Sequence, residues 1–230
     1  MGRLAASIAH EVNNPLEAVT NLIYLARTSH SLDAAREYLE TADRELIRAA
    51  GITSQTLRFY KQSTNPTESS GESLVRGLLT IHHGKLVNRG VQVEERFRSI
   101  RPVLCFEGEI RQVLSNLVGN ATDAMDATGG RLLVRTRDGH DWKTGRSGII
   151  LTVADTGSGM SPKTVKRIFE AFYTTKGMSG TGLGLWVSCQ IVARHHGELR
   201  VRSSQAAKHH GTVFTLFLPH EAAVRQPLAD

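Results

Sequence analysis

A histidine followed directly by a glutamate stands in the N-terminal stretch SIAHEVNNPL. With Ala5 at position a and Ile8 at position d of a heptad, His10 falls at f, farthest from the apolar seam, so its imidazole is predicted to face solvent. A neutral imidazole is a nucleophile, and a neighbouring carboxylate such as Glu11 can orient it and take its other proton. A zinc helix needs His-Glu-x-x-His, and this chain has Asn14 at the second histidine position. The stretch alone leaves two interpretations open, a reacting histidine or an ordinary surface His-Glu pair.

Two later stretches could bind a nucleotide. In NLVGNATDAM, Asn116 and Asn120 are four apart and share one face of a helix, and amide oxygens are hard ligands that suit Mg²⁺ on phosphates. In VADTGSGM, Asp155 ends a predicted strand and can accept a hydrogen bond from an exocyclic amine such as that of adenine. Gly157 and Gly159 let the backbone approach a flat base closely. Alone, each pattern also fits a plain alternative, a solvated helix face or an ordinary turn.

A third stretch, GTGLGLWVSCQIV, is a glycine-rich loop that leads into a helix. Free N–H groups at a helix start bind phosphate. The loop lacks the Gly-Lys-Ser/Thr of a Walker A motif, and the H-R-D and D-F-G motifs of eukaryotic protein kinases are also absent from the chain. The histidine doublets at 82–83, 195–196 and 209–210 have no metal-ligand spacing and are predicted to be solvated surface.

The elements that position these residues fall into two parts. Apolar residues alternate at spacings of three and four through residues 5–26 and again through residues 32–60, with a short polar stretch between them. This pattern predicts an antiparallel helical hairpin over residues 1–61. One hairpin cannot bury both seams well, so we expect two hairpins to form a homodimeric four-helix bundle that buries Leu39 and Leu46. The polar, serine-rich stretch 62–72 is predicted to be a linker.

Residues 73–220 mix helices and strands, and residues 221–230 form a C-terminal tail. Helices are predicted at 74–88, 110–125, 162–169 and 184–195, and strands at 91–97, 103–106, 132–136, 149–154, 199–202 and 213–218. The fold class is therefore α+β, with a layer of helices on one sheet.

The composition of the chain makes some classes of protein more plausible than others. Among 230 residues, 40% are hydrophobic, so the chain can bury a core, and the formal charge of +6 favours anionic partners. Two cysteines far apart in sequence fit a reducing cytosol. No apolar run approaches the length of a membrane span. Nucleic-acid binding is not expected, because aromatic residues make up only 6% and no recognised motif is present. Helical periodicity starts directly after Met1-Gly2 with no helix cap before it, so we expect the chain to be a fragment whose upstream part is missing.

Taken together and in this order, the stretches resemble the bacterial two-component sensor histidine kinases. RQVLSNLVGNATDAM resembles the N box of that family, VADTGSGM its G1 box, IFEAFYTTK its F box, GTGLGL its G2 box and AHEVNNPL its phosphoacceptor H box. The resemblance covers nearly the whole chain. It implies a dimerisation and phosphoacceptor domain over 1–61 and an ATP-binding α/β sandwich of the Bergerat type over 73–220.

The resemblance also implies a role for each matching residue. His10 would accept the γ-phosphoryl group of ATP, Glu11 would polarise the imidazole, and Asn14 would position water for dephosphorylation of the partner. Asn120 would be the Mg²⁺ ligand. The remaining positions implied to contact ATP are Asn116, Asp155, Gly157, Gly159, Lys176, Gly182, Gly184 and Thr212. The implied partners are a second copy of the chain and the receiver domain of a response regulator, and the resemblance also implies an upstream sensor region that is absent from this chain. The implied location is the cytoplasm, with a full-length protein that is either soluble or membrane-anchored.

One position separates kinase from ATPase. DNA gyrases, mismatch-repair clamps and ATP-dependent chaperones share this nucleotide fold but carry a water-activating glutamate where this chain has Asn116. An amide cannot act as a general base, so the site is expected to hold ATP without rapid hydrolysis. The alternatives are an ATPase clamp, which Asn116 disfavours, and a non-catalytic dimeric scaffold, which the retained motifs disfavour. The sequence does not name the stimulus, the response regulator, or which subunit supplies the phosphoryl group.

Overall fold

The computed structural model describes residues 2–60, 65–125, 129–141, 144–177 and 180–221, and within the helices the side chains of residues 2–11 and 54–60 lie outside that description. The chain divides into two compact units. One consists of residues 1–61 with 170–183, and the other of residues 62–169 with 184–230. None of the helices in the described ranges is long and apolar enough to cross a membrane.

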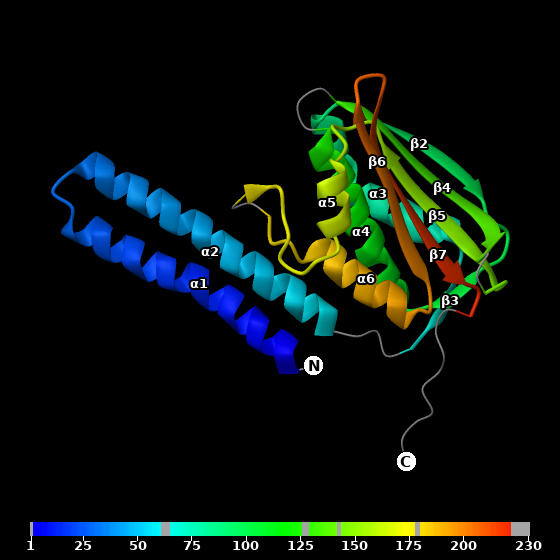
Figure 1. Cartoon of the computed structure of the whole chain (residues 1–230), viewed down its shortest axis with the longest axis horizontal. Helices are drawn as coiled ribbons and strands as arrows, with labels where there is room; N and C mark the ends of the chain where they lie inside the picture. Colours follow the sequence, from blue (N-terminus) through cyan, green and yellow to red (C-terminus); the bar gives the residue numbers. More distant parts are fainter. Residues whose placement is uncertain (1, 61–64, 126–128, 142–143, 178–179, 222–230) are drawn as a thin grey trace, which may run out of the picture. The chain divides into compact units, whose positions relative to one another are not determined.

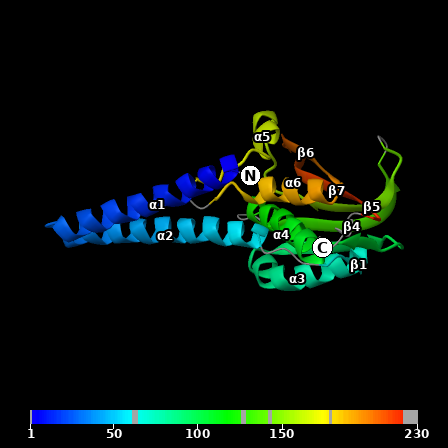
Figure 2. The ribbon, with the colours of Figure 1, turned by 90° about the horizontal axis from the view of Figure 1, so that it is seen from below.

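The first unit contains the predicted helical hairpin. Helix α1 (Gly2–Thr28) and helix α2 (Leu32–Tyr60) lie side by side (Figure 2). The polar stretch between them turns the chain, and the hydroxyl of Ser31 accepts a hydrogen bond from the backbone N–H of Ala34 at 3.3 Å. Such a bond satisfies a donor at the start of α2 that has no partner within the helix. The hairpin prediction is confirmed.

The predicted apolar seam of α2 splits into two stripes. The buried residues among the described side chains of α2 are Ala42, Glu45, Ala49 and Ile52, which form one stripe along the helix. Leu39 and Leu46, which we placed in the same seam, remain 52% and 51% exposed in the single chain. Two packed helices bury only one stripe each, so the wider apolar face of α2 is not covered within one hairpin. These leucines are thus available to a second copy, and the dimer stays a prediction.

The second unit is a five-stranded sheet with helices on one face (Figure 1). Its elements in chain order are β1 (Thr67–Ser69), α3 (Gly71–Asn88), β2 (Val91–Arg98), β3 (Val103–Cys105), α4 (Glu107–Ala124), β4 (Gly130–His140), β5 (Ser147–Asp155), α5 (Pro162–Arg167), α6 (Gly184–Arg194), β6 (Glu198–Ala206) and β7 (His209–Pro219). The strand order is β2-β4-β5-β7-β6. Only the β2–β4 pair among these described strands is parallel.

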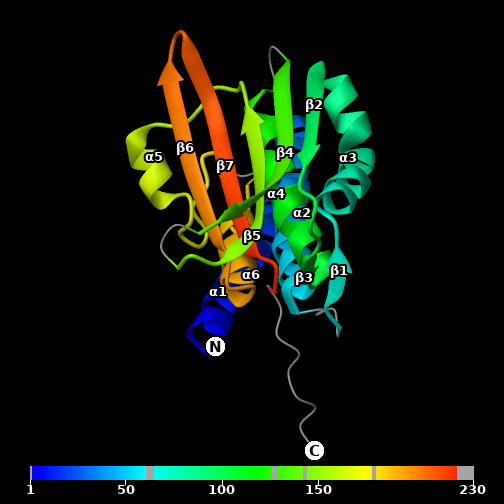
Figure 3. The same ribbon diagram turned by 90° about the vertical axis from the view of Figure 1, so that its right-hand side faces the viewer.

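The core lies between the sheet and the helices α3, α4 and α6. On neighbouring strands, Val134, Leu151 and Leu216 point to the helices and are each at most 1% exposed. Leu114 and Leu117 of α4 complete this core from the helix side, where both are buried. Alternate residues on each strand therefore face away from the helices, and Figure 3 looks onto that opposite face. The predicted α+β class, a helical region followed by an α/β sandwich, is confirmed.

Part of the predicted linker is regular structure. Strand β1 pairs antiparallel with β3, and the hydroxyl of Ser70 caps α3 by accepting from the N–H of Ser73 at 3.0 Å. The serine-rich composition suggested a linker over 62–72, but serine is also a preferred helix cap. Residues 67–72 therefore belong to the folded second unit.

Candidate nucleotide-binding site

Asp155 ends strand β5 and is held by two backbone N–H groups. Its Oδ1 accepts from the N–H of Gly157 at 2.9 Å and from the N–H of Thr212 at 3.2 Å. The residue is 8% exposed. Burial raises the pKa of the Asp155 carboxyl above its usual range, and the two backbone hydrogen bonds act in the opposite direction. No hydrogen bond to Oδ2 comes from any residue that the structure describes, so this oxygen can accept from a ligand.

The glycines beside Asp155 allow close approach of backbone to backbone. A Cβ on Gly157 would lie 2.6 Å from the carbonyl oxygen of Ala124. Gly159 has a φ of +67°, and a Cβ there would collide with the carbonyl oxygen of Ser204. A left-handed backbone without room for a side chain requires glycine. The turn after β5 is therefore wedged between the end of α4 and strand β6.

Side chains of β6 and β7 hold the same turn in place, and sequence reasoning missed them. Nδ1 of His210 lies 2.8 Å from the carbonyl oxygen of Gly157, so the ring donates from this nitrogen. The hydroxyl of Ser203 accepts from the N–H of Met160 at 2.8 Å and lies 2.9 Å from the hydroxyl of Thr212. These contacts depend on the pairing of β6 with β7, which the sequence pattern does not reveal.

Asn116 connects α4 to the start of α6. Its Nδ2 donates to the carbonyl oxygen of Gly184 at 2.9 Å and to the hydroxyl of Ser188 at 3.1 Å. Asn116 thereby fixes the helix end that follows the glycine-rich loop. Its Oδ1 is the atom that remains for a ligand. Asn120 lies one helical turn later on α4 and is partly exposed.

A buried histidine joins the other ends of these helices. His195, at the end of α6, accepts from the N–H of Phe106 at 3.2 Å through Nε2 and donates to the carbonyl oxygen of Ile191 at 2.8 Å through Nδ1. Its side chain is fully buried, so the prediction that this doublet is solvated surface is wrong for His195. Burial lowers its pKa below the ordinary value, which keeps the ring neutral. Beside it, Arg194 pairs with Glu109 at 2.8 Å.

For the predicted site residues of the first unit, the structure describes fewer side-chain contacts. His10 and Glu11 lie within α1, but their side chains are outside the described part of the structure. Asn14 is exposed on the same helix. Lys176 and Gly182 lie in the segment 170–183, which groups with the hairpin unit. Gly182 has a φ of +64° and a Cβ there would meet the backbone of Phe172, so a glycine is required.

Among the described residues, the polar side chains of this site fit a nucleotide better than a metal ion held by protein side chains alone. No cluster of three or more His, Cys, Asp or Glu side chains able to hold a metal occurs among the described residues. Asp155 offers a buried acceptor for an amine. An amide oxygen such as that of Asn120 is a type of ligand that Mg²⁺ accepts.

Family comparisons agree with this geometry. Residues 106–222 match the family described as histidine kinase-, DNA gyrase B- and HSP90-like ATPase, and residues 1–65 match the His kinase A (phospho-acceptor) domain. The chain is a member of the two-component sensor histidine kinases. Sporulation kinase E of Bacillus subtilis is 33% identical over 95% of this chain, and the histidine-protein kinase AtoS of Escherichia coli is 32% identical over 95% of it. The chain spans only 28% and 35% of these relatives.

Solved histidine kinases share the fold. The mycobacterial kinase MprB matches with a TM-score of 0.54 and 26% identity over 68% of this chain and 97% of that structure. The kinase ThkA in complex with the response regulator protein TrrA matches with a TM-score of 0.69 and 22% identity over 96% of this chain and 62% of that structure. In this histidine kinase, Asp155, Gly157 and Thr212 come together as expected. The structure also brings Ser203 and His210 to the turn after Asp155, where they contact Met160 and Gly157. Ser188 lies beside Asn116.

Proposed function

We propose that this chain is the catalytic part of a sensor histidine kinase, which transfers the γ-phosphoryl group of ATP to His10 and then to an aspartate of a response regulator. The observation that carries the ATP site is the geometry of Asp155. Two backbone N–H groups hold Oδ1 in place, and this fixes the direction in which Oδ2 can accept a hydrogen bond from a ligand. A buried acceptor beside a glycine turn suits the exocyclic amine and the flat face of adenine.

The remaining residues have distinct tasks in this proposal. Asn116 holds the start of α6, whose N–H groups can face phosphate, because Gly184 is the first residue of that helix. Asn120 would hold a Mg²⁺ ion, which neutralises charge on the phosphates when it is bound. In the transfer, the bond between the γ-phosphorus and the bridging oxygen breaks as the imidazole nitrogen of His10 bonds to phosphorus. ADP leaves, and Glu11 stabilises the imidazole that has become positive.

The partners follow from the same family. ThkA was solved with a response regulator, and we infer that the receiver domain of such a regulator is also the phosphate acceptor here. The exposed Leu39 and Leu46 of α2 support a homodimer of the hairpin. We place the chain in the cytoplasm, where ATP and response regulators are found. A stimulus would reach it through a region outside this chain.

An ATPase clamp is the second candidate function, and Asn116 argues against it. Its amide nitrogen donates two hydrogen bonds, so the side chain acts as a helix anchor and has no basic atom for activating water. The two functions differ in the fate of the phosphoryl group. A kinase retains it on the protein, whereas a clamp releases inorganic phosphate.

The test is incubation of the chain with ATP labelled at the γ-position. We expect label on the protein that is lost in acid and retained in base, as a phosphorus–nitrogen bond behaves. His10→Ala should abolish the label and leave ATP affinity unchanged, and His30→Ala, which changes an exposed histidine at the hairpin turn, should retain it. Label that persists in His10→Ala, or rapid release of free phosphate without label, would contradict the proposal.

A further inference from the structure

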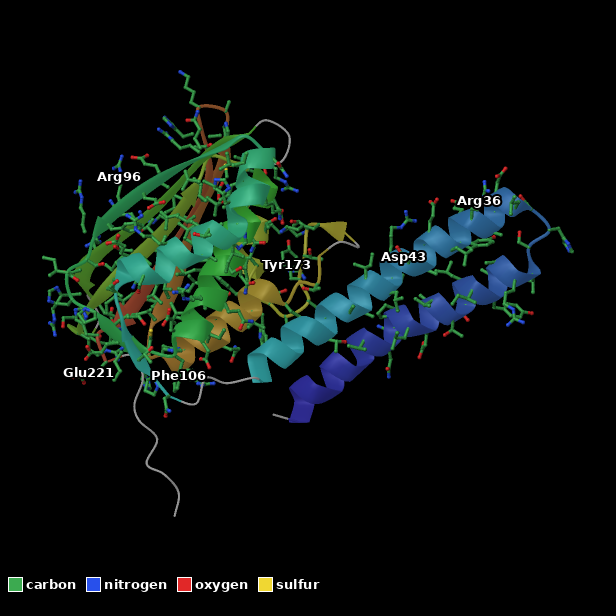
Figure 4. The ribbon with its side chains drawn as sticks, turned by 180° about the vertical axis from the view of Figure 1, so that it is seen from behind. Arg36, Asp43, Arg96, Phe106, Tyr173 and Glu221 are labelled. Carbon is green, nitrogen blue, oxygen red and sulfur yellow. The ribbon has the colours of Figure 1, made fainter. Side chains whose placement is uncertain are left out.

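The face of the sheet opposite the helices carries an unusual concentration of arginine. Side chains that alternate with the buried core residues of each strand point to this face. Among the described residues, the arginines with this orientation are Arg96 and Arg98 on β2, Arg131, Arg135 and Arg137 on β4, and Arg200 and Arg202 on β6. We call this set the arginine face. Figure 3 shows the strands with no helix in front of them, and in Figure 4 Arg96 points away from the helices.

Few carboxylates balance these charges. Glu94 pairs with Arg96, and Glu198 pairs with Arg200. In the described part of the chain, no carboxylate pairs with the other members of the arginine face: Arg98, Arg131, Arg135, Arg137 and Arg202. The Nε of Arg135 is shielded from solvent and has no hydrogen-bond partner. The face is therefore strongly positive and has guanidinium groups available to anions.

The strand register places arginines directly opposite one another, which lowers the stability of the folded sheet. Arg96 lies directly opposite Arg135, and Arg98 lies directly opposite Arg137, on the paired strands β2 and β4. Like charges in directly opposed positions destabilise a sheet. Neither pair supports the core, because the core side chains point to the other face. An anionic partner would remove this repulsion, which is the first argument for a binding surface.

The middle of the face is uncharged. The side chains that β5 and β7 direct there are Ile150, Thr152, Ala154, Val213, Thr215 and Phe217. Strands β4 and β6 border this strip and are three strand spacings apart in the order β4-β5-β7-β6, which is about 14 Å at the usual spacing. An α-helix with its side chains is about 10–12 Å across, so one helix fits between the two arginine borders.

We propose that the arginine face binds an acidic amphipathic helix of a partner protein. The apolar stripe of that helix would lie on β5 and β7, and its flanking glutamates or aspartates would pair with the arginines of β4 on one side and β6 on the other. The planar guanidinium group can bind a carboxylate through two parallel hydrogen bonds, which fixes orientation as well as adding affinity. The proposal does not depend on the kinase reaction, because no residue of the arginine face belongs to the nucleotide site.

Two other anionic partners fit the face less well. Single-stranded nucleic acid needs exposed aromatic rings for stacking, and Phe217, the one Phe, Tyr or Trp among the described strand residues that point to this face, is only 7% exposed. An anionic membrane surface favours large apolar side chains that insert among the lipids, but the uncharged strip offers no more than Val213 at 38% exposure. Both serve as competing ligands in the test.

The test measures binding of a fluorescent synthetic peptide by the complete chain at moderate salt. The peptide has about 18 residues, with glutamates on both sides of a leucine stripe, which spans about 27 Å as a helix. We expect micromolar affinity, and about tenfold weaker binding by the variant Arg135→Gln/Arg137→Gln/Arg202→Gln, which loses charge on both borders. The matched control Arg101→Gln/Lys163→Gln/Lys208→Gln removes three charges elsewhere on the surface and should bind as the unchanged chain does. Unaltered ATP affinity in both variants shows that the fold is intact.

Three results would overturn the proposal. One is equal affinity of the unchanged chain and the arginine variant for the peptide. Another is equal binding of a scrambled peptide with the same composition, since charge alone would then explain the binding. The third is preferential binding of a single-stranded oligonucleotide or of phosphatidylglycerol vesicles at the same salt concentration.

Discussion

Replacement of Asp155 by asparagine tests the nucleotide site at a single atom. In the structure, Oδ1 accepts from the N–H groups of Gly157 and Thr212, and these bonds fix the orientation of the carboxylate. Asparagine has the same shape, and its carbonyl oxygen can accept both bonds. The amide nitrogen must then occupy the position of Oδ2. The substitution therefore turns an acceptor into a donor at the point that faces a ligand, and it leaves the turn intact.

The expected loss of ATP affinity follows from that change. A hydrogen bond to a charged group contributes about 1.5–3 kcal/mol, which corresponds to about 10- to 150-fold in the dissociation constant. The loss should be as large without Mg²⁺ as with it, because the adenine amine and not the phosphates makes the contact. Asn120→Ala should show the opposite pattern, with a larger effect on Mg²⁺-dependent phosphoryl transfer than on binding.

The same substitution should stabilise the empty protein. Burial is the largest cause of the raised pKa of Asp155, so the folded state prefers the protonated carboxyl. A group whose folded pKa is raised contributes stability that is present at low pH and is lost as the pH rises through the folded pKa. At neutral pH, Asp155→Asn should thus melt at a higher temperature than the unchanged chain. The difference should shrink as the pH falls toward the range in which Asp155 is protonated.

The assay is calorimetric titration of both proteins with ATP and with inosine triphosphate, which has a carbonyl oxygen in place of the adenine amine. Asp155→Asn should bind ATP more weakly and inosine triphosphate at least as well as the unchanged chain, because its amide can donate to that oxygen. Equal losses for both nucleotides would refute the reasoning and indicate a general disruption of the site.

Three further predictions concern other parts of the molecule. Leu46 is 51% exposed in the single chain and is predicted to be buried in the dimer, where loss of a buried leucine costs about 2–5 kcal/mol. Leu46→Asp should therefore give a monomer in light scattering, and a retained dimer would mean that α2 presents another face to its partner. Because burial lowers the pKa of His195, the stability that its neutral ring contributes is lost as the pH falls through the folded pKa. In His195→Gln, whose amide can still accept from the N–H of Phe106, the melting temperature should therefore fall less steeply than in the unchanged chain as the pH drops below about 6.5. Asn14→Ala should slow decay of the phosphorylated response regulator and leave labelling of His10 unchanged, and identical decay rates would assign Asn14 no part in it.

The helical hairpin was predictable because its signal is local. Spacings of three and four repeat over residues 5–26 and 32–60, and the polar turn between them needs no distant contact. It was harder to predict which stripe of α2 is buried. Glu45 is 8% exposed whereas Leu46 is 51% exposed, although the heptad assigned Leu46 to the seam. On a wide apolar helix face, the neighbour decides which stripe it covers, and periodicity alone does not identify that neighbour.

The sheet shows the limit of local patterns more clearly. Each long strand was predicted near its true position, but the parallel pairing of β2 with β4 and the order β2-β4-β5-β7-β6 depend on contacts between distant residues. Strand β1 was missed because it has only three residues, and these resemble a polar linker. For the same reason, Ser203 and His210 could not be assigned to the site. Their chemistry is ordinary until β6 pairs with β7 and brings them to the turn after Asp155.

Asn116 shows how the structure changes the meaning of a residue that the sequence identified correctly. From the sequence, the amide matters because it cannot act as a general base. In the structure, its Nδ2 also donates to the carbonyl oxygen of Gly184 and to the hydroxyl of Ser188. A glutamate at this position could not donate to the Gly184 carbonyl and would place one acceptor against another. The start of α6 is therefore built for an amide, so a water-activating carboxylate would need a different anchor for that helix as well as a different residue at position 116.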